Sequence, residues 1–150
     1  MADIVNNELM DFVHGTTDVR WKGPKIFSKG VGEFGTGFYT FEDTSWGRRV
    51  ASEWANRKAN QEGSKPILVR VSIPLEVYTR LKTKKITEKT LNNFYERWYK
   101  EAATGYELVI GPVGKNAGGK KREANKNYPE QYKFEGSGII ALKVEDVIQL

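Results

Sequence analysis

The sequence contains no cysteine and a single histidine, His14. Without cysteine, the chain can form no disulfide, no thiol nucleophile and no cysteine-based zinc site. With one histidine, every metal motif that needs two imidazoles is excluded, and a single imidazole base is left for chemistry. We therefore expect no bound metal.

Long apolar runs and a secretory signal are also missing. The longest apolar stretches are fragments such as Ile67-Leu68-Val69, which are too short to cross a membrane. The segment from Met1 to Asn7 is acidic and polar, and it has neither the basic start nor the apolar centre of a signal peptide. We expect no membrane association and no signal peptide in this chain.

The composition suits one folded domain over residues 1–150, because 39% of the residues are hydrophobic and 12% are aromatic. Lysine and arginine total 24 against 19 acidic residues, which gives a net charge of +5. A basic stretch is typical of a solvated loop, and it also favours acidic partners such as phosphates or nucleic acid. Six of the cations lie close together in the sequence: Lys115, Lys120, Lys121, Arg122, Lys126 and Lys133.

The spacing of apolar and turn residues predicts six strands and two helices. Asp43 and Thr44 can cap the first helix, and Gly105 stands where the second would end. The mixture predicts an α+β fold with a mostly antiparallel sheet. We expect helices at about 44–60 and 87–103, strands at 9–16, 37–41, 67–73, 107–113, 131–134 and 139–144, and a long basic loop before residue 131.

One glycine-rich stretch has the G-x-G-x-x-G spacing of a dinucleotide-binding loop, Gly30-Val31-Gly32-Glu33-Phe34-Gly35. Such a loop needs a helix directly after it, but the strand-like segment Gly37 to Phe41 follows instead. The chain also lacks a kinase catalytic loop, a P-loop and the G-x-S-x-G of a serine hydrolase. We interpret residues 23–37 as a flexible loop.

Several short motifs occur in a fixed order along the chain. They are Val13-His14-Gly15-Thr16, Phe34-Gly35-Thr36-Gly37-Phe38-Tyr39-Thr40, Ala51-Ser52-Glu53-Trp54-Ala55, Leu108-Val109-Ile110-Gly111-Pro112-Val113 and Gln131-Tyr132-Lys133-Phe134. This order resembles the ADP-ribosyltransferases of the His-Tyr-Glu type, in their toxin-like branch. The resemblance runs from Phe12 to Leu142, with no matching motif between Leu75 and Gly105. It implies a split antiparallel sheet with flanking helices.

The resemblance also implies NAD as co-substrate. His14 would hydrogen-bond a ribose hydroxyl, the Gly15 backbone would pair with the nicotinamide amide, and Tyr39 would stack on the nicotinamide ring. The threonines would contribute hydroxyl hydrogen bonds, and Gly37 would allow close backbone approach. The residues implied in NAD binding are His14, Gly15, Thr16, Gly37, Tyr39 and Thr40.

The third catalytic position is less clear from the motifs. Cleaving the nicotinamide–ribose bond passes through an oxocarbenium-like state, so the protein must orient NAD and stabilise positive charge. The family places a glutamate at the start of a late strand for this purpose, and the local match here is Gln131. Glu130 and Glu135 are close enough in sequence to compete. The implied catalytic set is therefore His14, Tyr39 and Gln131, with the third position open.

These motifs predict an NAD-dependent mono-ADP-ribosyltransferase that acts as a toxin or delivered effector in the cytoplasm of a target cell. The acceptor would be a protein or an RNA, which the basic loop would help to recognise. By resemblance, a cognate immunity or antitoxin protein would be a partner. We expect a monomer. The alternatives are an NAD glycohydrolase, which uses water as acceptor, and a basic nucleic-acid-binding module without catalysis.

Overall fold

A seven-stranded sheet organises the chain in the computed structural model, which describes residues 8–24, 32–99, 104–118 and 121–150. The strand order is β4-β5-β8-β2-β1-β3-β9, and β6 and β7 form a separate hairpin. Every neighbouring pair in the large sheet is antiparallel except β4 and β5. The predicted α+β class with a mostly antiparallel sheet is therefore confirmed.

The described elements have the following bounds. The strands are β1 (Leu9–Thr17), β2 (Phe38–Glu42), β3 (Pro66–Pro74), β4 (Thr83–Lys85), β5 (Leu108–Gly111), β6 (Gly114–Asn116), β7 (Arg122–Ala124), β8 (Gln131–Phe134) and β9 (Lys143–Gln149). The helices are α1 (Ser45–Glu62), α2 (Leu75–Arg80), α3 (Leu91–Trp98) and α4 (Ser137–Ile140).

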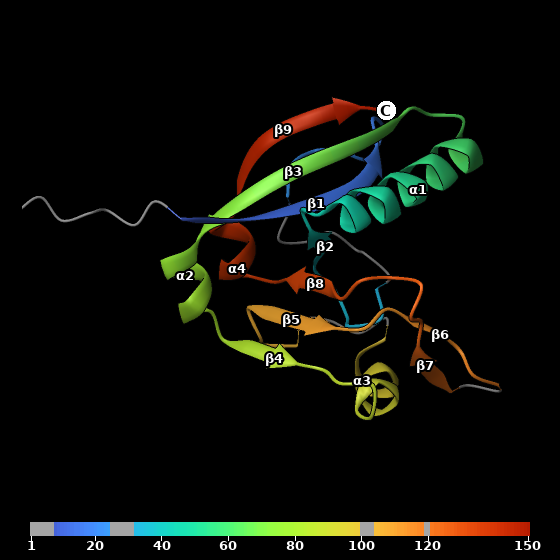
Figure 1. The fold of residues 1–150 in the computed structure, drawn as a ribbon, viewed down its shortest axis with the longest axis vertical. Coiled ribbons are helices and arrows are strands. Elements are labelled where there is room, and N and C mark those ends of the chain that lie inside the picture. Colours follow the sequence, from blue (N-terminus) through green and yellow to red (C-terminus); the bar gives the residue numbers. More distant parts are fainter. Residues whose placement is uncertain (1–7, 25–31, 100–103, 119–120) are drawn as a thin grey trace, which may run out of the picture.

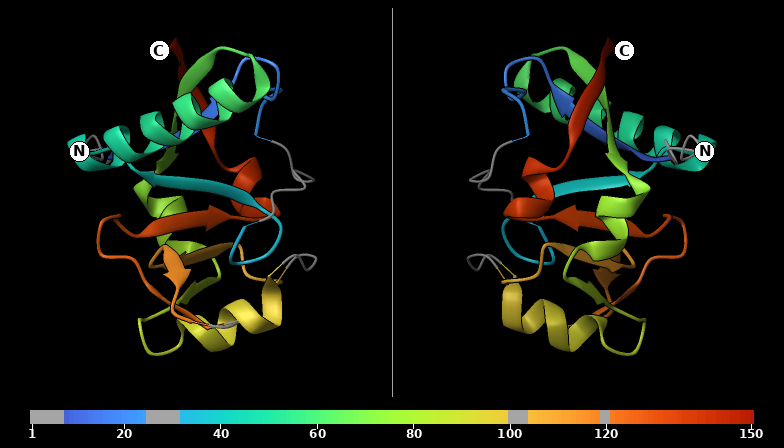
Figure 2. Two further views of the ribbon diagram at one scale, coloured as in Figure 1. Left: turned by 90° about the vertical axis from the view of Figure 1, so that its right-hand side faces the viewer. Right: turned by 90° about the vertical axis from the view of Figure 1, so that its left-hand side faces the viewer.

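The helices lie at different ends of the sheet. Helix α1 runs beside β1 and β3, whereas α3 and the β6–β7 hairpin lie beyond β5 at the opposite end of the molecule (Figure 1). The turned views in Figure 2 show the same order, with β2 and β8 crossing the middle. The strands that carry the predicted site residues, β1, β2 and β8, are therefore central and adjacent.

Helix α1 begins where the predicted cap, Thr44, places it. The Thr44 hydroxyl accepts a hydrogen bond from the Gly47 backbone at 3.0 Å, which satisfies one of the free N–H groups of the first turn. Gly63 ends the helix in the left-handed conformation, two residues later than predicted. The buried side of the helix is made by small residues: Gly47, Val50, Ala51, Ala55 and Ala59.

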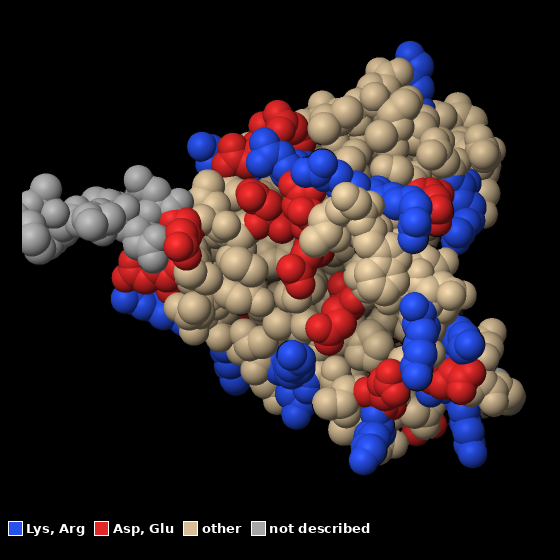
Figure 3. Space-filling model, in the orientation of Figure 1, with Lys and Arg blue, Asp and Glu red and all other residues tan. Residues whose placement is uncertain are grey.

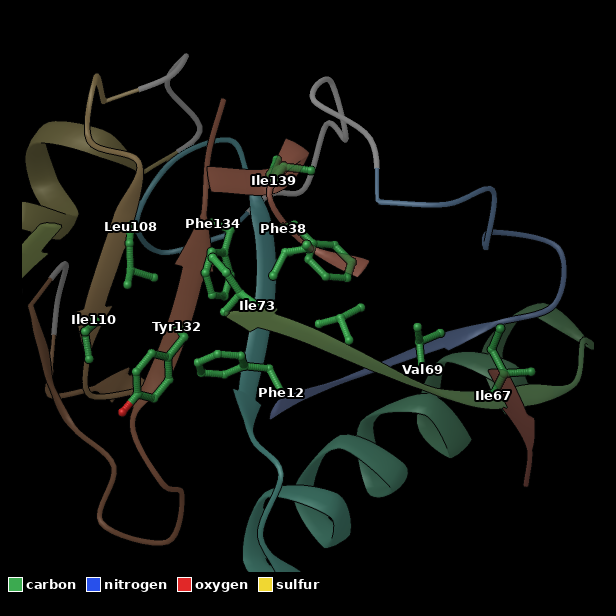
Figure 4. Packing of buried hydrophobic residues seen from close by; sticks show 12 residues of the cluster. Phe12, Phe38, Ile67, Val69, Ile73, Leu108, Ile110, Tyr132, Phe134 and Ile139 are labelled. Carbon is green, nitrogen blue, oxygen red and sulfur yellow. The ribbon is translucent and has the colours of Figure 1, made fainter. Parts of the chain in front are cut away.

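Both faces of the central strands are buried. On one face, the Phe12 ring packs against Tyr132 and Phe134, with ring centroids 5.0 and 5.1 Å apart, and Phe38 belongs to the same cluster (Figure 4). On the other face, Val13 packs with residues of α1 such as Val50. Two buried faces also account for the continuous apolar run Ile67-Leu68-Val69 of the neighbouring strand β3, whose side chains alternate between the two clusters.

Two sequence predictions are wrong at their ends. The second helix ends at Tyr99, which is already extended, so Gly105 does not cap it. Gly105 instead takes a positive φ of 90° in a turn and donates its N–H to Glu135. The strand expected over 139–144 is also wrong at its start, because Ile139 and Ile140 close the short helix α4 and β9 begins at Lys143.

The remaining predictions hold in outline, and some elements were missed. Strands β1, β2, β3, β5 and β8 lie where the sequence placed them, to within one or two residues. Helix α2, strand β4 and the β6–β7 hairpin were not predicted, and the hairpin occupies the expected basic loop. Residues 25–31 of the glycine-rich loop, 100–103 of the expected helix and Lys120 lie outside the described residues. None of the described helices is both long and apolar enough to cross a membrane.

Candidate functional site

The hydrogen-bonded pairing between β1 and β2 is short. Strand β1 pairs with β3 over nine residues, but it pairs with β2 only at Phe12 with Glu42 and at Val13 with Phe41. If the register continued, Gly15 would face Tyr39, yet the described pairing has ended before that point. Strands β1 and β2 therefore separate from His14 onward, next to the motif residues Gly15 and Tyr39.

The backbone N–H and C=O of Gly15 point toward β2, where β1 and β2 are no longer paired. The Asp11 carbonyl accepts a hydrogen bond from Asp43, just beyond β2, so Asp11 directs its backbone polar groups toward β2. Successive residues of an antiparallel strand alternate the edge toward which their N–H and C=O point. Val13 and Gly15 thus face the same edge as Asp11, and Gly15 has no ladder partner there among the described residues. A free donor and a free acceptor on one residue suit a ligand amide.

His14 bridges the two strands where the ladder stops. Its Nδ1 lies 2.6 Å from the Tyr39 carbonyl oxygen, and because a carbonyl can only accept, Nδ1 must carry the proton. Burial lowers the pKa of His14, although the Tyr39 carbonyl opposes this shift. The imidazole is therefore neutral at pH 7, and its Nε2 is a hydrogen-bond acceptor. Such a nitrogen can accept a hydrogen bond from a hydroxyl.

Tyr39 is held by its own loop. Its hydroxyl accepts a hydrogen bond from the Phe34 backbone at 2.9 Å and donates to the Gly35 carbonyl. A Cβ at Gly32 would collide with the tyrosine ring, so the loop lies directly against it. Burial raises the pKa of the hydroxyl well above its usual range. The tyrosine therefore remains an uncharged hydrogen-bond donor, and residues 32–35 lie against its ring.

The glycines of the motifs are required by packing. A Cβ at Gly15 would collide with the Ala51 carbonyl, so the glycine lets α1 lie directly on β1. A Cβ at Gly37 would collide with the side chain of Lys133 and approach the Phe134 carbonyl. These contacts give a structural reason for both glycines that is independent of any ligand.

Thr16 and Thr40 are buried. Thr40 donates its hydroxyl to the Tyr132 carbonyl at 2.9 Å, which ties β2 to β8. Thr16 is 8% exposed. The Thr40 hydroxyl is thus used within the protein, and its predicted role in binding NAD stays a prediction.

The three candidates for the third position have different surroundings. Glu130 is exposed. Glu135 is buried, and its carboxylate accepts hydrogen bonds from Lys133, from the Thr104 hydroxyl and from the Gly105 N–H. Burial acts to raise the pKa of Glu135, but these donors lower it overall. Glu135 is therefore an ionised carboxylate whose oxygens are occupied.

Gln131 begins β8, where the sequence placed it, and is 2% exposed. Its Nε2 donates to Glu33 Oε1 at 3.2 Å and to the Pro112 carbonyl at 3.3 Å. Both partners can only accept, so the amide NH₂ must face them and the carbonyl oxygen Oε1 points away. Gln131 thus presents an acceptor oxygen whose direction is fixed.

The structure does not bring the His14 imidazole to the same face as the other two side chains. Val13, Phe41 and Gln131 are opposite one another across the three strands, so their side chains share one face. Tyr39 is two residues from Phe41 and points to that face, whereas His14 follows Val13 and points to the other. Accordingly, the His14 ring lies 4.4 Å from Phe38, in the opposite core cluster.

Sequence reasoning missed two residues beside this site. Glu33 accepts a hydrogen bond from Gln131, although it stands in a loop that the motifs did not interpret. Trp21 lies near His14, with ring centroids 6.3 Å apart, because its backbone N–H bonds the Thr17 carbonyl at the end of β1. Glu33 could have been suspected as the only carboxylate in the glycine-rich stretch.

Comparison with known proteins gives no relative. No family model, no curated protein and no solved structure matches the chain. Within the described ranges, no three histidine or acidic side chains gather in a group that could hold a metal ion. The function is therefore inferred from the geometry of β1, β2 and β8 and from the motifs they carry.

Proposed function

We propose that this chain is an NAD-dependent mono-ADP-ribosyltransferase, a toxin or effector with an ADP-ribosyltransferase-like split sheet. The observation that carries the proposal is the end of the β1–β2 ladder. There a free backbone N–H and C=O on Gly15 stand next to a neutral histidine whose Nε2 accepts hydrogen bonds. These are the groups that the carboxamide and a ribose hydroxyl of NAD need.

The residues of β1 would bind NAD and orient it. Gly15 would donate its N–H to the carboxamide oxygen and accept from the carboxamide nitrogen, which fixes the nicotinamide ring. His14 Nε2 would accept from a ribose hydroxyl, and the Nδ1 bond to Tyr39 holds the imidazole in that tautomer. When bound, NAD supplies the ADP-ribosyl group and a leaving group that is already cationic.

A residue of β8 would stabilise the positive charge of the oxocarbenium-like state. Because Gln131 lies on the opposite face of the sheet from the His14 imidazole, its Oε1 would accept from a ribose hydroxyl only if the ribose extended between β1 and β2 beyond their last paired residues. There it would place a partial negative charge near the developing cation. The Tyr39 ring could reach nicotinamide only if residues 32–35 moved away from it. We therefore expect Tyr39 to act after a loop shift, or to support the site through its hydroxyl bonds.

The acceptor would meet the end of the molecule that carries α3 and the β6–β7 hairpin. Lysine and arginine side chains project there, around α3 and the β6–β7 hairpin, with carboxylates among them (Figure 3). A protein or an RNA would be recognised by these cations, and a cognate immunity or antitoxin protein would cover the site. The place of action would be the cytoplasm of a target cell.

The test is release of nicotinamide from NAD by the purified chain in a target-cell lysate. Adenine-labelled NAD is followed separately into protein, RNA and free ADP-ribose. We expect release by the wild-type chain and its loss in His14→Ala. Label in protein or RNA identifies the acceptor, whereas free ADP-ribose alone would indicate a glycohydrolase. If no lysate supports release, the transferase proposal is wrong and a nucleic-acid-binding module becomes the better interpretation.

A further inference from the structure

The Glu33 carboxylate accepts four hydrogen bonds. Its side chain is 13% exposed and receives four donors from three separate elements. Oε1 accepts from the Gly114 N–H at 2.8 Å and from Gln131 Nε2 at 3.2 Å. Oε2 accepts from Arg122 Nε at 3.1 Å and Nη2 at 2.8 Å. The carboxylate is held by donors on both of its oxygens.

The neighbours of Glu33 are themselves fixed. Arg122 begins β7, donates its backbone N–H to Asn92 Oδ1 of α3 at 2.8 Å and places its guanidinium 5.0 Å from the Tyr95 ring centroid. Gly114 has no Cβ, and a Cβ there would collide with Glu33 Oε2. The β6–β7 hairpin and α3 therefore hold the carboxylate at one point in front of β8.

The Glu33 carboxylate fixes the orientation of the Gln131 side-chain amide. A neutral side-chain amide can turn its NH₂ and its oxygen to either side at little cost, unless its partners distinguish them. Here the Glu33 carboxylate and the Pro112 carbonyl both accept hydrogen bonds from the NH₂, so this group must face them. A hydrogen bond to an anion also polarises the amide and makes Oε1 a stronger acceptor, because hydrogen bonds in series reinforce one another.

We infer that Glu33 is the positioning residue of the third catalytic position: it orients and polarises Gln131, and so supplies from the loop the negative charge that β8 lacks. The inference rests on the proposed function, since it assigns the charge to the NAD reaction. Gln131 remains the residue that would touch the ribose, and Arg122 holds the Glu33 carboxylate in place.

The first experiment compares NAD cleavage by the wild-type chain, Glu33→Gln and the exchange variant Glu33→Gln/Gln131→Glu. We expect Glu33→Gln to lower kcat about tenfold or more with little change in KM, because orientation of the acceptor matters most in the transition state. The exchange variant returns a carboxylate to the pair and should recover activity. Asn92→Ala is the control, because it loosens the hairpin without touching Gln131. Unchanged kcat in Glu33→Gln would overturn the inference.

A second measurement does not depend on activity. The side-chain amide signals of Gln131 are followed by NMR and assigned by their loss in Gln131→Met. We expect slowly exchanging amide protons with shifts displaced from those of solvent-exposed glutamine in the wild-type chain, and faster-exchanging protons with shifts closer to the exposed values in Glu33→Gln. If the signals do not respond to Glu33→Gln, the inference is wrong. If they respond but the wild-type chain cleaves no NAD, the proposed function fails and the orienting role of Glu33 stands.

Discussion

At the scale of single residues, the motifs predicted that the site residues lie on strands, but not which groups they hydrogen-bond. His14, Tyr39 and Gln131 lie on strands, as predicted, and the structure shows that these strands, β1, β2 and β8, are adjacent. The hydrogen bonds of His14 and Gln131 could not be predicted, because each joins segments far apart in the sequence. The bond from His14 to Tyr39 spans 25 positions, and the one from Gln131 to Glu33 spans 98. No local pattern encodes such pairs.

The sole histidine makes one prediction about pH. Burial holds the pKa of His14 below the 6.5 of the unfolded chain, so the unfolded chain takes up a proton first as the pH falls. The free energy of unfolding should therefore be constant above about pH 6.5 and decrease below it, down to the folded-state pKa. Urea unfolding at intervals between pH 5 and 8 measures this.

His14→Asn is the control, because asparagine does not titrate and its protein should lose the decrease within this window. The chain has no other histidine to contribute there. A wild-type stability that rises as the pH falls from 6.5 to 5 would contradict the neutral, buried imidazole.

At the scale of elements, helix caps and β-branched runs predicted helices and strands correctly, whereas a short apolar run did not distinguish between them. Thr44 and Gly63 delimit α1 by local hydrogen bonds, which sequence can reveal. The run from Gly138 to Leu142 suits either a strand or one helical turn. Ile139 and Leu142 are three residues apart and both buried, whereas Ile140 is 69% exposed, so the helical spacing prevails.

Helix α1 gives a prediction about stability. Thr44→Ala removes the acceptor of the Gly47 N–H and should lower the free energy of unfolding by about 1 kcal/mol. Thr44→Ser keeps a hydroxyl at the same position and should lose much less. Urea denaturation of the three proteins compares them. Equal losses in the alanine and serine variants would show that the hydroxyl bond does not stabilise the helix.

At the scale of the whole molecule, the basic hairpin separates into two kinds of cation. Arg122 is largely covered and pairs with Glu33, so it belongs to the interior of the site. Lys115, Lys121 and Lys126 are exposed and available to a partner. The sequence could not distinguish them, because both kinds occur in one polar run.

This division predicts how charge reversal would act. Lys115→Glu/Lys121→Glu/Lys126→Glu should lower the labelling of an acidic or RNA acceptor, and increasingly so at low salt, where exposed charges are least screened. Nicotinamide release without acceptor should stay unchanged, since none of these residues lies on β1, β2 or β8. Label transfer at several salt concentrations tests this. Undiminished labelling at every salt concentration would exclude the hairpin from acceptor binding.

The central claim is that the free backbone edge of Gly15 binds the nicotinamide carboxamide, and the Gly15 amide resonance tests it most directly. Nicotinamide, NAD and nicotinate are each titrated into ¹⁵N-labelled protein. We predict that the Gly15 signal moves strongly with nicotinamide and NAD but little with nicotinate, which has no amide N–H to give to the Gly15 carbonyl. A Gly15 signal that stays in place at saturating NAD would contradict the claim.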